Sequence, residues 1–328
     1  MSYEALNRRR FVGAAAAGGA LLCFGRTGHA ALPDTIRFVV GYAPGGASDA
    51  LTRALADGLA RRSKRTTLVE NKPGAGSLTA MRSTKNGPAD GSVLFTSSAA
   101  SVIQSLKPSN RVRLDSDFAP ILMTHRGQFT LFTNASVPVT TLKELITYDR
   151  ANPGKLSYAS FGVGGQSHLA MELLNQKTGM KLTHVPYKSN AEAILSVLKG
   201  ETQVMLNPFS SLKQHVDAGK LRALAVTSKE PSPHAPGVPG MREAGVDGYE
   251  VSFWFGVNAP VGTPEATLQW LNQELNEVLR EPVAQAVIRD QFGADTIGGS
   301  RDDFARVIAG EMKTYEDLIR TANIQLEE

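Results

Sequence analysis

Two glycine-rich segments hold the residues best placed to do chemistry. They are Tyr42-Ala43-Pro44-Gly45-Gly46-Ala47-Ser48-Asp49 and Phe161-Gly162-Val163-Gly164-Gly165-Gln166-Ser167-His168. Each lies between a short apolar run typical of a buried strand and a run with apolar residues at helical spacing. A strand-to-helix turn presents backbone N–H groups at the positive end of a helix dipole, where an anion can bind. If the two segments face one another, they can hold one anionic ligand from two sides. A tight turn with Ser48 as helix N-cap and nothing bound also explains the first segment.

The signatures of more specific chemistries are incomplete in these segments. The second segment lacks the third glycine of the dinucleotide-binding fingerprint, and Thr183-His184-Val185-Pro186 stands where that fingerprint expects an acidic residue. Neither segment is followed by the lysine of a phosphate-binding P-loop. The run Gly165-Gln166-Ser167-His168-Leu169 lacks the last glycine of a nucleophile elbow. A secreted serine hydrolase that uses Ser167 and His168 is the alternative to a binding function, and a Rossmann oxidoreductase is a third hypothesis.

Two side chains of these segments need an explanation of their own. A carboxylate at Asp49 would repel an anion, so it either accepts amide hydrogens and holds its loop open or meets an amino group on the ligand. His168 lies in the first turn of a helix, where we expect it to hydrogen-bond the loop or the ligand. The histidines after residue 30 show no pair at metal-ligand spacing, so we expect neither a metal site nor a cofactor.

The first 30 residues have the composition of an export signal. Arg8, Arg9 and Arg10 precede an uncharged segment too short for the ~20 residues of a membrane span, and Gly28-His29-Ala30 offers small residues for cleavage. The sequence therefore predicts a periplasmic protein. The arginine pair before Phe11-Val12 also resembles a twin-arginine leader, and a plain secretory leader fits the same residues. Cys23 is the single cysteine and lies in this leader, so the mature chain has no thiol chemistry.

The charge of the chain argues against a nucleic-acid partner. The full sequence has 35 Lys and Arg against 31 Asp and Glu, a net charge of +4. Removing residues 1–30 takes away four basic residues and one acidic residue and leaves a net charge of +1. No basic face survives that subtraction. We expect a monomer.

Strand and helix patterns alternate after the leader, which predicts an α/β fold with parallel sheets. Two such series follow one another, and helices dominate from Thr263 onward. We expect strands at 36–40, 66–69, 92–96, 129–133, 155–160, 182–185, 203–206 and 221–227. We expect helices at 51–59, 78–84, 142–150, 168–177 with Gly179 as C-cap, and 191–199 with Asn190 as N-cap. Two further helices are expected after Thr263-Pro264, with Thr263 as N-cap, and after Ser300.

The chain resembles the Bug family, the extracytoplasmic solute receptors of tripartite tricarboxylate transporters, in a series of motifs that occur in order along the sequence. The matching pieces are Pro44 to Asp49, Glu70 to Gly76, Pro88 to Gly91, Gly162 to His168, His184 to Lys188, Gly219 to Val226 and Ala259 to Pro264. The resemblance implies a two-lobed, type II periplasmic-binding-protein clamshell, each lobe a mostly parallel sheet flanked by helices. It implies one lobe from residues 31–128 with 254–328, the other from 129–253, and crossing strands near 121–133 and 251–257.

The resemblance also implies a receptor without catalysis that takes a small carboxylate to membrane transporter subunits or signals its presence. The carboxylate would be held by loop amides, hydroxyls and bridging waters. The implied ligand-binding residues are Tyr42, Ala43, Pro44, Gly45, Gly46, Ala47 and Asp49 in one lip, Ser160, Phe161, Gly162, Gly164, Gln166, Ser167 and His168 in the other, and Ser98, Tyr187 and Asn207 in the pocket. Family members often have an aspartate near Asn207, so its neutral side chain favours a purely acidic or aromatic ligand over an amino acid. Phe161, Phe253 and Trp254 could stack on a ring, although core or hinge packing also explains the last two.

Overall fold

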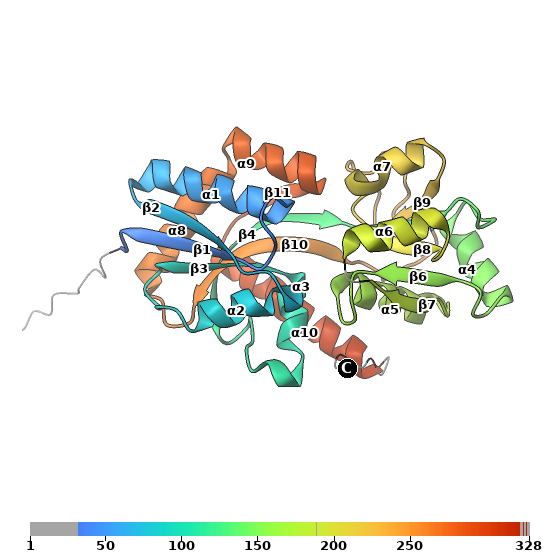
Figure 1. Ribbon diagram of the computed structural model, residues 1–328, viewed down its shortest axis with the longest axis horizontal. Coiled ribbons are helices and arrows are strands. Elements are labelled where there is room, and N and C mark those ends of the chain that lie inside the picture. Colours follow the sequence, from blue (N-terminus) through green and yellow to red (C-terminus); the bar gives the residue numbers. More distant parts are fainter. Residues whose placement is uncertain (1–31, 188, 322–323, 325, 327–328) are drawn as a thin grey trace, which may run out of the picture. The chain divides into compact units, whose positions relative to one another are not determined.

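The chain forms two β-sheets with helices packed against both faces of each (Figure 1). This computed structural model describes residues 32–187, 189–321, 324 and 326. The export signal expected over residues 1–30 lies outside the described residues. No helix in the described ranges is both long and apolar enough to cross a membrane.

The first sheet combines a parallel half with an antiparallel half. In spatial order its strands are β11 (Asp295–Gly298), β4 (Phe118–Gln128), β10 (Ser252–Pro260), β3 (Val93–Ser98), β1 (Thr35–Val40) and β2 (Thr66–Asn71). The strands β1, β2 and β3 are parallel, as expected for consecutive βαβ units. The strand β10 is antiparallel to both β3 and β4, and β11 is antiparallel to β4. We expected mostly parallel sheets; this one is mixed because β10 returns from the second sheet in the opposite direction.

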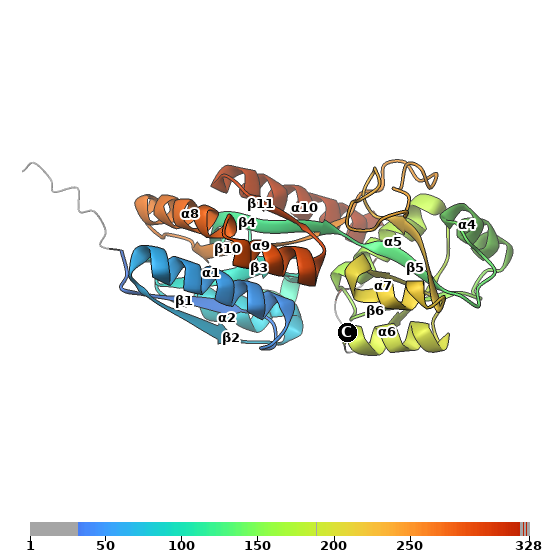
Figure 2. The ribbon, with the colours of Figure 1, turned by 90° about the horizontal axis from the view of Figure 1, so that it is seen from above.

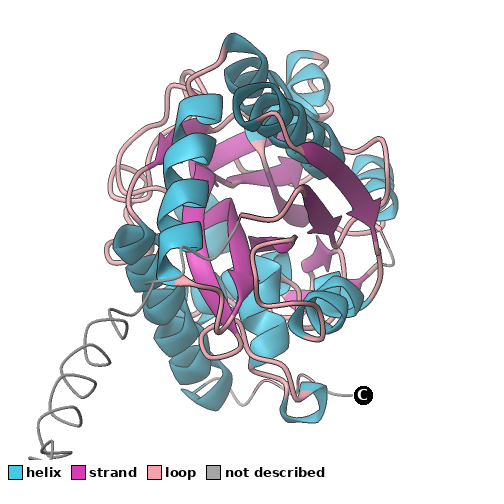
Figure 3. Cartoon of the chain, turned by 90° about the vertical axis from the view of Figure 1, so that its left-hand side faces the viewer, coloured by secondary structure: helices cyan, strands magenta, loops and turns pink. Residues whose placement is uncertain are grey.

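Helices pack on both faces of the first sheet (Figures 2 and 3). On one face α1 (Ala47–Ser63) contacts α8 (Glu265–Leu279) and α9 (Pro282–Val287), and on the other face α3 (Ala99–Ser105) contacts α2 (Leu78–Lys85) and α10 (Arg301–Thr321). Short helical turns are η1 (Ala75–Ser77), η2 (Pro108–Asn110) and the π-turn η3 (Ile288–Phe292). The face toward α2, α3 and α10 buries Val39, Phe95 and Trp254, and the other face buries Phe38, Leu94 and Val257. This alternation follows from the two-residue period of strands.

The second sheet is also mixed. Its order is β7 (Thr183–Pro186), β6 (Ser157–Ser160), β8 (Val204–Asn207), β5 (Thr130–Asn134) and β9 (Leu221–Val226), with β5 antiparallel to both neighbours. Its helices are α4 (Leu142–Ala151), α5 (Gln166–Thr178), α6 (Asn190–Lys199) and α7 (Phe209–Asp217). Alternate strand residues divide between the faces. Leu131 and Tyr158 belong to the core that contains α4 and α5, whereas Phe132 and Ala159 belong to the core that contains α6 and α7.

Two crossings join the sheets, and hydrogen bonds tie the crossings together. The strand β4 leads directly into β5 through Phe129, and the chain returns after β9 into β10 (Figures 1 and 2). The Thr227 hydroxyl accepts the Phe129 N–H at 2.9 Å and donates to the Val251 carbonyl at 2.6 Å. Thr227 is fully buried. One side chain therefore holds both connecting segments.

Most expected elements are present, and three expected helix caps were wrong. Gly46 precedes α1, so Ser48 lies inside that helix; Ser189 caps α6 by accepting the Glu192 N–H at 3.2 Å, so Asn190 is its first residue. Pro264, not Thr263, precedes α8. In each case a neighbour adopts the extended backbone that an N-cap needs. Gly179 does end α5 in the left-handed conformation, with φ 68°. The elements α3, α7, α9 and β11 have no counterpart among the expected elements.

Candidate ligand-binding site

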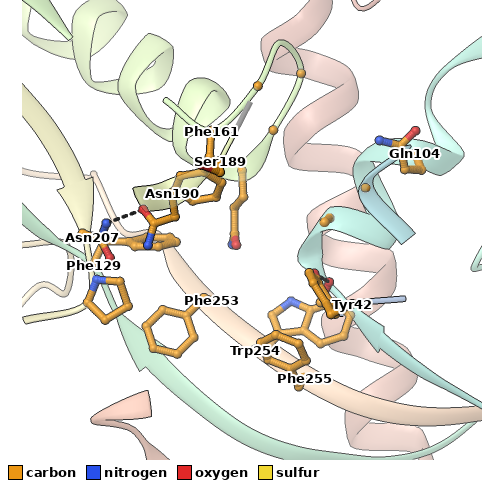
Figure 4. A pocket seen from close by; sticks show the side chains of 18 of the residues that line it. Tyr42, Gln104, Phe129, Phe161, Ser189, Asn190, Asn207, Phe253, Trp254 and Phe255 are labelled. Atoms are coloured by element: carbon orange, nitrogen blue, oxygen red, sulfur yellow. Dashed lines mark hydrogen bonds between the residues drawn. The ribbon is translucent and has the colours of Figure 1, made fainter. Parts of the chain in front are cut away.

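A cavity of about 690 Å³ lies where the ends of strands from both sheets meet (Figure 4). Seven of the expected binding residues line it: Tyr42, Ser98, Phe161, Gly162, Gly164, Gln166 and Asn207. The other expected residues do not line it: Ala43, Pro44, Gly45, Gly46, Ala47, Asp49, Ser160, Ser167, His168 and Tyr187. Residues that were not expected also contribute, among them Gln104, Lys107, Phe129, Ser189, Asn190, Phe255 and Phe292.

The first glycine segment forms a braced turn beside the cavity. Asp49 accepts the Gly45 N–H at 3.0 Å, the Arg53 Nε–H at 2.9 Å and an Asn71 Nδ2–H at 2.9 Å. Burial alone would raise the pKa of the Asp49 carboxyl, but these hydrogen bonds outweigh it and lower the pKa. Of the two explanations considered for Asp49, the structure supports the one in which it accepts amide hydrogens. Its ionised form fixes the turn that positions Tyr42, whose hydroxyl lies 2.9 Å from the Ser98 hydroxyl.

The second glycine segment is held from beneath by a pair of stacked histidines. The Gly164 N–H donates to His168 Nδ1 at 2.9 Å, and the rings of His168 and His184 stack with centroids 3.9 Å apart and planes at 7°. His184 Nε2 lies 2.6 Å from the Ser160 hydroxyl, which in turn donates to the Gly162 carbonyl at 3.2 Å. These side chains therefore shape the loop from outside the cavity lining. Such support orients binding groups without touching the ligand.

The same loop leaves donors available toward an anion. Gly162 and Gly164 have φ of 124° and 65°, values that favour glycine, and within the described ranges the N–H groups of Gly162 and Val163 donate to no protein acceptor. They precede α5, so the helix dipole adds to their attraction for negative charge. A carboxylate placed here would satisfy N–H groups that the protein leaves free.

Both histidines are held in their neutral form. Burial lowers the pKa of His168 to about 4, and burial together with repulsion from His168 lowers the pKa of His184 to about 4. A neutral His168 can accept the Gly164 N–H, whereas a protonated ring could not. The shape of the loop therefore depends on uncharged imidazoles.

Lys107 places a cation at the cavity. Of the described residues that line it, Lys107 alone carries a charge, and no carboxylate in the described part of the chain lies within ion-pair distance of its amine. A Cβ added to Gly164 would lie 3.7 Å from the Lys107 Nζ, so the amine reaches the second glycine loop. An anion at this loop would gain both the amides and the ammonium group.

The geometry does not support the hydrolase alternative. Ser167 is fully buried inside α5, its hydroxyl has no hydrogen-bond partner among the described residues, and it does not line the cavity. His168 uses Nδ1 to accept a backbone N–H rather than to face a carboxylate. A nucleophile must be reachable by substrate and by its base, and this serine meets neither condition. The structure also brings together no group of three metal-ligating side chains within its described residues.

Comparison with known proteins decides the family. The model of the tripartite tricarboxylate transporter family receptor matches residues 51–324. The chain belongs to this receptor family. BugT of Bordetella pertussis is 31% identical over 294 residues, which cover 89% of this chain and 90% of BugT. Members of the family are receptors rather than enzymes.

Solved structures agree with this assignment and with the two-lobed clamshell. The periplasmic binding protein BugD has a TM-score of 0.75 at 29% identity, over 89% of this chain and 98% of BugD. R. palustris Rpa4515, solved with adipate, has a TM-score of 0.76 at 30% identity over 88% and 97%. MatC (Rpa3494) of Rhodopseudomonas palustris, solved with malate, has a TM-score of 0.74 at 26% identity over 87% and 98%.

Proposed function

We propose that this receptor binds a small organic carboxylate in the cavity and delivers it to membrane subunits of a tripartite tricarboxylate-type transporter. The observation that carries the proposal is the convergence of free loop amides and the unpaired Lys107 amine on one cavity. Relatives of the same fold hold adipate and malate. Here we expect the carboxylate to bind at Gly162 and Val163, beside Lys107.

We also propose that the receptor works in the periplasm and that its two lobes close on the ligand. Residues 1–30 act as a cleaved signal peptide, by a secretory or twin-arginine route, and the mature monomer works in the periplasm. Residues 31–128 with 254–328 form one lobe and residues 129–253 the other. A ligand that contacts both lobes binds the closed state better than the open one, so it shifts the population toward closure.

Thermal unfolding of the mature chain, residues 31–328, tests this function. The protein is refolded from denaturant to remove bound ligand and mixed with mono-, di- and tricarboxylates, aromatic acids and amines. A ligand at 100 times its Kd adds about 2.7 kcal/mol to stability, which raises Tm by several degrees. We expect a shift with a carboxylate and none with an amine. A folded protein that responds to no carboxylate would contradict the proposal.

A charge variant identifies the site. Lys107→Met should weaken carboxylate binding about tenfold and reduce its dependence on salt, because a partly desolvated ammonium group is removed from the anion. The matched control is Lys143→Met, since Lys143 is exposed on α4 and does not line the cavity. Equal affinity in the two variants would place the anion elsewhere.

A further inference from the structure

The wall of the cavity is rich in aromatic side chains. Tyr42, Phe161 and Phe255 line it and are only half-buried, so each leaves ring surface open to a ligand. Tyr42 and Phe255 come from the first sheet and its loops, with ring centroids 5.7 Å apart, whereas Phe161 comes from the second glycine loop. Phe253 and Phe129, 5.3 Å apart, continue the aromatic surface below (Figure 4). Such faces suit a flat ring, because offset and edge-to-face aromatic contacts add to apolar burial.

The charge of the wall limits the charge of the ligand. One ionised carboxylate on the ligand balances the charge of Lys107. Among the described lining residues there is no second cation to pair with another carboxylate. A second ionised carboxylate would lose its hydration among aromatic side chains without gaining a charged partner from these described residues. Lys107 therefore matches one carboxylate group of the ligand.

Asn207 adds a requirement at another part of the cavity. It is 1% exposed, and its Nδ2–H donates to the Asn190 Oδ1 at 2.7 Å, while its own Oδ1 has no partner among the described residues. Figure 4 shows Asn207 with Phe129 and Phe253, on the opposite side of the cavity from Tyr42 and Phe255. A buried carbonyl oxygen can only accept, so a hydroxyl donor on the ligand would satisfy it.

We propose that the ligand is an aromatic monocarboxylic acid that carries a hydroxyl group on its ring, with the carboxylate at the second glycine loop and the hydroxyl donating to Asn207. This inference rests on the proposed function, because it assumes that a carboxylate binds at this loop. The ring lies between Phe161 and the pair Tyr42 and Phe255. A carboxylate in place of the hydroxyl would meet the Asn207 oxygen as a second acceptor and be rejected.

Calorimetric titration of the refolded mature chain with four acids tests the inference. Three share one skeleton: 3-phenylpropanoate, 3-(4-hydroxyphenyl)propanoate and 3-(4-carboxyphenyl)propanoate; the fourth, adipate, has no ring. We expect the hydroxyl compound to bind about tenfold more tightly than the unsubstituted one, the cost of an unpaired buried acceptor, and the carboxyl compound to bind weakest of the three. Adipate should bind less tightly than 3-phenylpropanoate.

Two variants at Asn207 assign the hydroxyl preference to this residue. Asn207→Leu should bind 3-phenylpropanoate and its hydroxyl analogue with equal affinity, whereas Asn207→Asp keeps an acceptor and should retain the tenfold preference. Retention of the preference in Asn207→Leu would overturn the assignment. The wild-type series decides the ligand class even if a variant fails to fold.

The outcomes separate this inference from the proposed function. If adipate or the carboxyl compound binds most tightly, or if hydroxyl and unsubstituted acids bind equally, the inference is wrong while carboxylate binding stands. If none of the four acids binds but another carboxylate raises Tm, again only the inference falls. If no carboxylate binds in either experiment, the proposed function falls with it.

Discussion

At the scale of single residues, the second glycine loop depends on side chains that do not line the cavity. His168 fixes the Gly164 amide and stacks on His184, which lies beside Ser160. Ser160, Gly164 and His168 were expected to bind the ligand directly or to hydrogen-bond the loop. Of these three residues, Gly164 lines the cavity, whereas Ser160 and His168 do not. Their positions indicate that they shape the loop.

This role predicts how His168 variants behave. His168→Ala should weaken ligand binding about tenfold, because the Gly164 N–H loses its acceptor and the loop loses its fixed shape. His168→Asn should restore most of the affinity, since the Asn Oδ1 can occupy the place of Nδ1. Titration calorimetry with a carboxylate found in the thermal screen measures both. His215→Ala serves as the control, because His215 lies on α7 and does not line the cavity. Equal losses in the alanine and asparagine variants would argue against the positioning role.

At the scale of elements, the crossings between the sheets carry a buried hydrogen-bond clasp. Thr227→Val keeps the volume of the side chain but leaves the Phe129 N–H and the Val251 carbonyl without the hydroxyl. We expect a loss of about 2–3 kcal/mol in the free energy of unfolding, measured by urea denaturation.

An exposed threonine provides the comparison for Thr227. The Thr147 hydroxyl donates to the Lys143 carbonyl within α4, where water can replace it. Thr147→Val should change stability by less than about 0.5 kcal/mol. If Thr227→Val were equally mild, the clasp would contribute little to joining the crossings.

Elements were predicted better than their ends. The helix expected at 78–84 is α2, Leu78–Lys85, and the strand expected at 129–133 is β5, Thr130–Asn134, because turn residues on both sides mark these segments. Cap positions failed where adjacent residues such as Ser189 and Asn190 are both good candidates. Only the backbone angle, which long-range packing sets, distinguishes them.

The binding residues were predicted from sequence motifs, so cavity residues that belong to no motif were missed. The glycine loops pointed to Gly162, Gly164 and Tyr42, which line the cavity. Lys107 follows a short helix and Phe292 ends a π-turn, and neither stands in a recognisable pattern. They reach the cavity because the chain folds them there from segments far apart in sequence. A lone lysine between Leu106 and Pro108 gives no local signal of that placement.

At the scale of the whole molecule, buried titratable groups set how stability depends on pH. Burial lowers the pKa of His125 to about 3, below the values of about 4 for His168 and His184. Burial raises the pKa of Glu311 to about 7, although the nearby Trp254 and Arg126 favour its ionised form. At a pH between these values, the folded protein therefore keeps the three histidines neutral and Glu311 protonated.

The three histidines and Glu311 change the pH dependence of stability in opposite directions, and the histidines contribute more. Near pH 5.5 the unfolded chain protonates its histidines, whose ordinary pKa is 6.5, whereas the folded chain leaves these three neutral; Glu311 alone is more protonated in the folded state. Unfolding then takes up about two protons, so stability rises with pH by roughly 2.5 kcal/mol per unit in this range. The histidine contribution is complete above pH 6.5 and is lost as pH falls toward 4. The Glu311 contribution has the opposite sign and is lost as pH rises from 4.5 to 7.

Two variants should change this slope in opposite directions. His168→Asn removes a group that takes up a proton on unfolding, so the slope near pH 5.5 should fall by about one proton equivalent. Glu311→Gln removes a group that releases a proton on unfolding, so the slope should rise by about the same amount. Urea denaturation of the ligand-free mature chain at half-unit steps from pH 4.5 to 7 measures both. Parallel curves for the wild type and the two variants would mean that these side chains exchange protons equally in the folded and unfolded states, which their burial does not allow.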